Sequence, residues 1–129
     1  MNMDKYAIFH IEGGCGKNIA ATAVIKSIKA AYPEHKLIVA AAWPEVFLHN
    51  PNVYRVYRFG HLPYFYDDYI KDKDSKIFRM EPYHSEDMLY RRKSLAEIWC
   101  DIHNIECITT KPEIFLTERE IWFAQQRLQ

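Results

Sequence analysis

A glycine-rich turn near the amino terminus gathers the residues best suited to bind an anion. It reads GGCGKN and holds Gly13, Gly14 and Gly16, three of the four glycines of the chain. Glycines let a backbone approach a ligand closely, and the N–H groups and dipole at a helix start favour a negative charge. Lys17 and Asn18 follow with a cation and an amide. The turn therefore predicts a site for a phosphorylated or other anionic ligand.

The turn is similar to the phosphate-binding loop of deviant, ParA/MinD-like P-loop proteins. Lys17 occupies the place of the phosphate lysine, after which a hydroxyl should hold Mg²⁺. Asn18 stands there instead, and Ile11 replaces the glycine expected six residues before the lysine. The second predicted strand closes with Ala42 and Trp43, where an acidic residue would be needed. A nucleotide-binding P-loop protein is therefore an alternative and not the favoured interpretation.

The residue pattern places the turn between a buried strand and an amphipathic helix. Residues 6–11 form an apolar run without alternation, which is typical of a strand covered on both faces. Apolar residues then recur at helical spacing over residues 19–28. A second unalternating run, residues 36–42, predicts a parallel strand after a right-handed crossover. We therefore expect residues 1–129 to form a single Rossmann-like α/β domain of three layers with a mostly parallel sheet.

The remaining elements are less regular. We predict a short helix at residues 44–48, a third strand at 53–59 and a fourth, short strand at 76–80. Residues 60–76 show no period and predict a functional loop, lid or mobile segment.

Two helices are expected in the last third of the chain. Ser85 suits the N-cap of one helix, whose apolar stripe consists of Met88, Leu95, Ile98, Trp99 and Ile102. Residues 110–116 should be extended, and a capping box at residues 117–120 starts the last helix. That helix has Ile121, Ala124 and Leu128 on one face.

A longer segment resembles a known enzyme family. The helix AATAVIKSIKAAYP, the strand KLIVA and the turn NPNVYRVY match one domain type in kind, order and spacing. That type is the N-terminal domain of ADP-heptose:lipopolysaccharide heptosyltransferases, glycosyltransferase family 9, and the resemblance spans residues 6–59. It implies one half of a GT-B fold, in which the N-domain holds the sugar acceptor and the C-domain the nucleotide-sugar donor.

The resemblance also implies roles for residues of the turn. Gly13 and Gly16 would let the backbone approach donor phosphate or acceptor. Lys17 takes the place of the family's aspartate, the general base, yet a protonated lysine accepts no proton. Glu12 lies near the position of the family's basic residue. We therefore expect a heptosyltransferase-like binding domain that is inactive alone, or one half of a split or truncated enzyme. Its partners would be a sugar or glycolipid acceptor and a second chain with the nucleotide-sugar domain, or further copies of itself.

Other side chains have a chemical and a structural interpretation. His10, at the end of the first strand, is a candidate general base or a hydrogen-bonded wall residue. Cys15 begins the helix, where a thiol becomes more reactive. Trp43 could line the ligand cleft or serve packing. Four carboxylates could hold a divalent cation but suit a solvated loop better, and we predict no metal: Asp67, Asp68, Asp72 and Asp74.

Composition narrows the class of protein. Hydrophobic residues make up 49% of the chain and charged residues 26%, which indicates a globular domain. The net charge of zero gives no basis for binding nucleic acid or an anionic membrane. The three cysteines form no CxxC, and no apolar run reaches the ~20 residues of a membrane span, so we expect a cytoplasmic protein. Nine tyrosines leave open a non-catalytic oligomeric interaction module, with an aromatic patch around residues 54–69.

Overall fold

The computed structural model describes residues 4–60 and 62–128, and its centre is a parallel β-sheet. Four strands of the described residues pair in the order β3-β2-β1-β4. They are β1 (Lys5–Ile11), β2 (Lys36–Ala41), β3 (Arg55–Arg58) and β4 (Asp74–Phe78). All three pairings are parallel. The predicted Rossmann-like α/β fold is therefore confirmed, and the carboxyl ends of β1 and β4 lie side by side.

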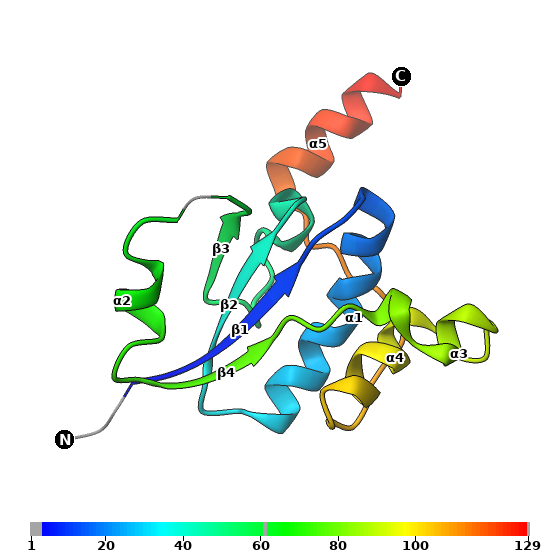
Figure 1. Ribbon diagram of the computed structural model, residues 1–129. Coiled ribbons are helices and arrows are strands. Elements are labelled where there is room, and N and C mark those ends of the chain that lie inside the picture. The colour runs from blue at the N-terminus through cyan, green and yellow to red at the C-terminus, as the bar shows by residue number, and fades with distance from the viewer. Residues whose placement is uncertain (1–3, 61, 129) are drawn as a thin grey trace.

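The main core lies between the sheet and the helices α1 (Cys15–Ala31) and α4 (Leu95–Ile102), which cover one face (Figure 1). Strand alternation turns Phe9 and Ile11 toward this face. The ring of Phe9 meets that of the fully buried Trp99 edge-on, with centroids 5.8 Å apart. This contact fixes α4 against the strand that leads into the glycine turn.

The opposite face has a thinner cover. Tyr6 and Ile8 of β1 pack there with Ile38 and with Tyr69 of the short helix α2 (Phe65–Tyr69). The rings of Tyr6 and Tyr69 stand edge to face at 5.1 Å. The domain thus has three layers, one of which contains a single five-residue helix.

Residues 60–76, predicted as a functional loop, lid or mobile segment, contain regular structure that the sequence did not predict. The segment contains α2, and β4 starts at Asp74, two residues earlier than predicted. A helix of five residues is too short to show a period, and its aromatic contacts with the sheet come from distant parts of the chain.

The single long helix predicted after Ser85 is also wrong, because two helices occupy this region. Ser85 does cap α3 (Glu86–Leu89), and its Oγ accepts a hydrogen bond from the N–H of Met88 at 3.1 Å. The chain then adopts a positive φ of 56° at Arg91, which ends the helix. Ser94 and Glu97 form a new capping box that starts α4.

Short 3₁₀ turns follow β2 and β4, namely η1 (Pro44–Phe47) and η2 (Pro82–His84). The first coincides with the short helix predicted after the second strand. Each places a proline in its first turn, where the missing N–H costs nothing.

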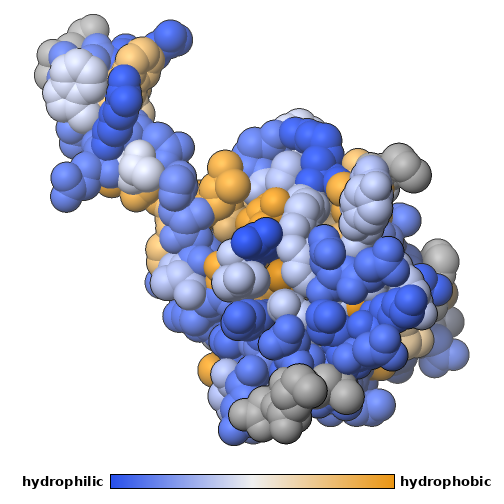
Figure 2. Space-filling model, turned by 90° about the vertical axis from the view of Figure 1, so that its left-hand side faces the viewer, coloured by the Kyte–Doolittle hydropathy of each residue, from blue (hydrophilic) through white to orange (hydrophobic). Residues whose placement is uncertain are grey.

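The carboxyl-terminal segment runs along α1 and then leaves the body of the domain. The N–H of Ile108 donates to Ser27 Oγ at 2.9 Å, and that of Glu113 to Thr22 Oγ1 at 3.0 Å. The predicted capping box of Thr117 and Glu120 is present and starts α5 (Glu118–Arg127). This helix projects from the carboxyl edge of the sheet and has no buried residue (Figures 1 and 2). Among the described residues, no helix is long and apolar enough to cross a membrane.

Candidate functional site

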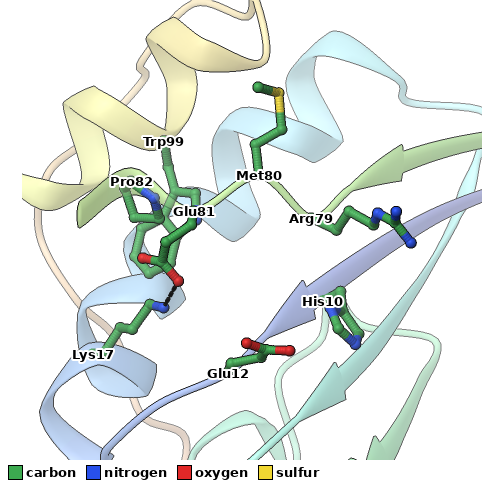
Figure 3. Close-up of a pocket in the computed structure, with 8 residues that line it drawn as sticks. All are labelled: His10, Glu12, Lys17, Arg79, Met80, Glu81, Pro82 and Trp99. Carbon is green, nitrogen blue, oxygen red and sulfur yellow. Dashed lines mark hydrogen bonds and ion pairs between the residues drawn. The ribbon is translucent and has the colours of Figure 1, made fainter. Parts of the chain in front are cut away.

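The clearest candidate site is a polar pocket where the ends of β1 and β4 meet the start of α1 (Figure 3). Its volume is about 190 Å³. The lining residues are His10, Glu12, Lys17, Arg79, Met80, Glu81, Pro82 and Trp99. A more open hollow of about 450 Å³ adjoins it, with Glu12, Lys17 and Glu81 shared and Gly13 and Tyr83 added. Open α/β sheets bind ligands at this edge.

Lys17 points across the pocket toward the segment that follows β4 (Figure 3). It is only 8% exposed and its ammonium group forms an ion pair with the Glu81 carboxylate. Its Nζ also lies 5.1 Å from the ring centroid of Tyr83 and 6.0 Å from that of Trp99. An ammonium group held in this way donates hydrogen bonds and has no lone pair with which to accept a proton.

The glycines of the turn have different structural roles. Gly13 has φ +94°, and a Cβ built on it would lie 2.9 Å from Cδ of Lys17. The positive φ favours glycine at residue 13, and an added Cβ would displace the lysine side chain. Gly14 and Gly16 would meet no atom within 4 Å, and Gly14 caps α1 without a side-chain hydrogen bond. The surface at Gly14 and Gly16 is therefore open, and no side chain caps the N–H groups at the start of α1.

Asn18, predicted as a ligand contact, is fully buried and used within the protein. Its Nδ2 donates to the carbonyl of Gly14 at 2.8 Å, and its Oδ1 accepts from the backbone N–H of Trp43 at 3.3 Å. The side chain therefore ties the glycine turn to the end of β2. Sequence reasoning had missed this role. Trp43 itself is 45% exposed and does not line the pocket.

His10 lies at the end of β1, on the face covered by α2. Its ring contacts that of Phe59, with centroids 4.1 Å apart. Burial lowers the pKa of His10, and the nearby Arg79 lowers it further against the opposing effect of Glu12. The imidazole is therefore neutral at pH 7 and can accept a hydrogen bond or a proton.

The pocket residues that were not predicted as site residues include Arg79, Glu81 and Trp99. Arg79 and Glu81 follow β4, in a stretch that the sequence indicated only as a strand end and a turn. Trp99 was predicted as part of an apolar stripe. No local pattern marks these residues, because they reach the glycine turn through the pairing of β1 with β4 and the packing of α4 on α1.

The charges of the pocket balance one another. Lys17 and Arg79 supply cations, Glu12 and Glu81 supply carboxylates, and His10 is neutral. The wall therefore presents both hydrogen-bond donors and acceptors, a mixture that suits hydroxyl groups, which both donate and accept. Among the side chains that the structure describes, His, Cys, Asp and Glu form no group of three or more that could hold a metal ion.

The fold and the pocket together define a Rossmann-like α/β domain with a polar site at the carboxyl edge of its sheet. No protein-family model and no curated protein matches the chain. Among solved structures, it is similar to the crystal structure of the glycosyl transferase family 9 from Veillonella parvula DSM 2008, with a TM-score of 0.63 at 13% sequence identity. The match covers 98% of this chain and 49% of that one. The chain therefore has a glycosyltransferase-like fold and spans about half the length of the solved protein.

Proposed function

We propose that this domain binds a sugar or a phosphorylated sugar in the pocket between β1, β4 and the start of α1. The observation that carries the proposal is the charge-balanced ring of polar side chains at the carboxyl edge of a glycosyltransferase-like fold. The pocket has a volume of about 190 Å³, and its wall contains both carboxylates and cations. This mixture matches the hydroxyl groups of a sugar ring, which both donate and accept hydrogen bonds. A phosphate on that sugar would lie at the N–H groups of residues 15–17, which no side chain caps.

The same geometry supports binding more than catalysis by the isolated chain. Lys17, at the position where the related family has its base, is held by Glu81 and cannot take a proton from an acceptor hydroxyl. The neutral His10 and the carboxylate of Glu12 are proton acceptors in the pocket that are not paired with Lys17. Heptosyltransferase-like transfer would further need a nucleotide-sugar donor. We propose that a second α/β half supplies its site.

The proposal is tested by titrating ¹⁵N-labelled protein with methyl β-D-glucoside 6-phosphate while recording amide spectra. The amides of residues 13–17 should shift first, because they surround the predicted phosphate position. Lys17→Met should weaken binding by about tenfold, the loss of one charge-assisted hydrogen bond. Lys26→Met is the matched control, because Lys26 also lies on α1 but forms its ion pair with Glu113, outside the pocket. Shifts elsewhere, or equal affinities for both variants, would contradict the proposal.

The P-loop alternative is tested in the same experiment with Mg²⁺ and ATP. The structure gives it little support: Asn18 is buried where a Mg²⁺-binding hydroxyl is needed, and Lys17 already has a carboxylate partner. We expect no saturable shift with Mg²⁺-ATP. Tight binding that Lys17→Met abolishes would favour the P-loop interpretation instead.

A further inference from the structure

A second hollow meets the polar pocket at His10. It lies on the α2 face of the sheet and has a volume of about 320 Å³. Apart from His10, its walls are mainly apolar and aromatic, and include Ile8, Ala40, Phe59, Phe65, Tyr66 and Ile70. In the polar pocket, by contrast, His10 lies among charged side chains (Figure 3). The end of β1 therefore separates two spaces of opposite chemistry.

The position of His10 places the two hollows beside each other. His10 pairs with Ala40 in the register of β1 and β2, and its side chain follows that of Ile8 on the α2 face. Its ring is the shared wall of the two hollows. The ring is tilted by 55° against that of Phe59, which lines the apolar hollow.

The apolar hollow favours a flat ring as its occupant. Aromatic walls gain from ring contacts beyond the area that they bury, in edge-to-face or offset arrangements. Phe59 and Tyr66 both line the hollow, and Tyr66 is 61% exposed, so an entering ring would cover apolar surface that now faces water.

We propose that the two hollows form one bipartite site for a glycoside, with the sugar in the polar pocket and an apolar, ring-shaped aglycone in the hollow behind His10. This proposal rests on the proposed function and narrows its ligand to glycosides of aromatic or similarly flat alcohols. His10 contacts both parts of the ligand and forms the boundary between them.

The test compares two probes that differ only in the aglycone, methyl and phenyl β-D-glucoside 6-phosphate. Their dissociation constants are measured by amide-shift titration of the complete chain. The phenyl compound should bind about tenfold more tightly, because its ring leaves water on binding. Phe59→Ala should reduce the ratio of the two affinities to about two or less, since it removes the ring beside His10.

A second variant and a control distinguish a local effect on the hollow from unfolding of the protein. Tyr66→Ala changes an exposed wall residue of the hollow. It should lower the ratio of the two affinities, while the amide spectrum remains that of a folded protein. Tyr90→Ala removes another exposed tyrosine, 67% accessible and outside both hollows, and should leave the tenfold ratio intact.

The outcomes separate this inference from the proposed function. If both probes bind with equal affinity, the bipartite site is refuted and the sugar site stands. If the phenyl preference survives in Phe59→Ala and Tyr66→Ala, the aglycone lies elsewhere and the inference fails. If neither probe binds, the proposed function fails, and the bipartite site with it.

Discussion

Lys17 and Glu81 are 64 positions apart in the sequence, yet their side chains form an ion pair in the candidate site. The lysine begins on the first turn of α1 and the glutamate follows β4. Their pairing joins the glycine turn to the segment that leads into η2. It also means that an anionic ligand must compete with a carboxylate for the lysine.

This competition predicts the effect of neutralising Glu81. Glu81→Gln should strengthen binding of a phosphorylated sugar several-fold, because a neutral amide competes less with phosphate for the Lys17 ammonium group. Calorimetric titration with methyl β-D-glucoside 6-phosphate measures the change. Glu86→Gln, on α3 and outside the pocket, is the control and should leave the affinity unchanged. Unaltered binding by Glu81→Gln would show that Glu81 does not compete with the phosphate for Lys17, and weaker binding would show that the Glu81 carboxylate contributes more to the sugar than it costs.

The glycine turn predicts opposite results for two alanine substitutions. Gly13→Ala should destabilise the domain by about 1–3 kcal/mol, because residue 13 has φ +94° and a Cβ would press on the Lys17 side chain. Gly16→Ala lies in α1 with no atom within 4 Å of the added Cβ, and should be neutral or stabilise by up to about 1 kcal/mol. Urea unfolding monitored by tryptophan fluorescence measures both. Similar losses for the two variants would be inconsistent with the described turn.

Two half-buried histidines predict how stability depends on pH. Burial lowers the pKa of His10 and also that of His103, which lies at the end of α4. Because each histidine has a pKa near 6.5 when unfolded and a lower one when folded, the unfolded chain binds more protons in between. Their contribution to stability is therefore complete above about pH 6.5 and is lost as the pH falls below it.

Urea unfolding at pH 7.5 and pH 5.5 measures this dependence. His103→Asn and His10→Asn should each reduce the difference in unfolding free energy between the two pH values. If neither variant alters the difference, other titrating groups cause the acid sensitivity.

The exposed helix α5 predicts self-association of the isolated chain. Ile121, Trp122, Phe123 and Leu128 are 43%, 57%, 56% and 87% exposed. The first turn of α5 is acidic and its last turn basic, so an antiparallel second copy would bring Glu118 close to Arg127. With Ile114 and Leu116, which are also exposed, two such helices could bury about 1,000 Å² in total, near the lower limit for a specific interface.

Sedimentation velocity over a range of concentrations tests this dimer. The double variant Ile121→Ser/Leu128→Ser should weaken association by at least about tenfold and leave the fold intact, because α5 has no residue buried in the described domain. Leu89→Ser removes a 72% exposed leucine on α3 and is the control. A monomer at all concentrations would instead leave α5 for a different partner.

Local pattern was enough to predict much of the fold. The unalternating runs in β1 and β2 identified parallel strands, and Ser85 and the capping box at Thr117 located two helix starts. These signals succeed because burial on both faces and the N–H groups of a helix start constrain neighbouring residues. The prediction failed for α2 and for the break between α3 and α4. Both are short and depend on contacts with distant residues or on one left-handed residue.

The sequence by itself determined that a glycine turn joins a buried strand to a helix, with Lys17 at the start of that helix. Only the tertiary structure decided what surrounds the lysine. Strand β4 pairs beside β1 and brings Arg79 and Glu81 to the turn, while α4 places Trp99 beneath it. It likewise decided that the buried Asn18 connects the glycine turn to the end of β2 by hydrogen bonds. It also placed His10 between a polar and an apolar hollow. Such contacts join residues far apart in the chain, so no local spacing could reveal them.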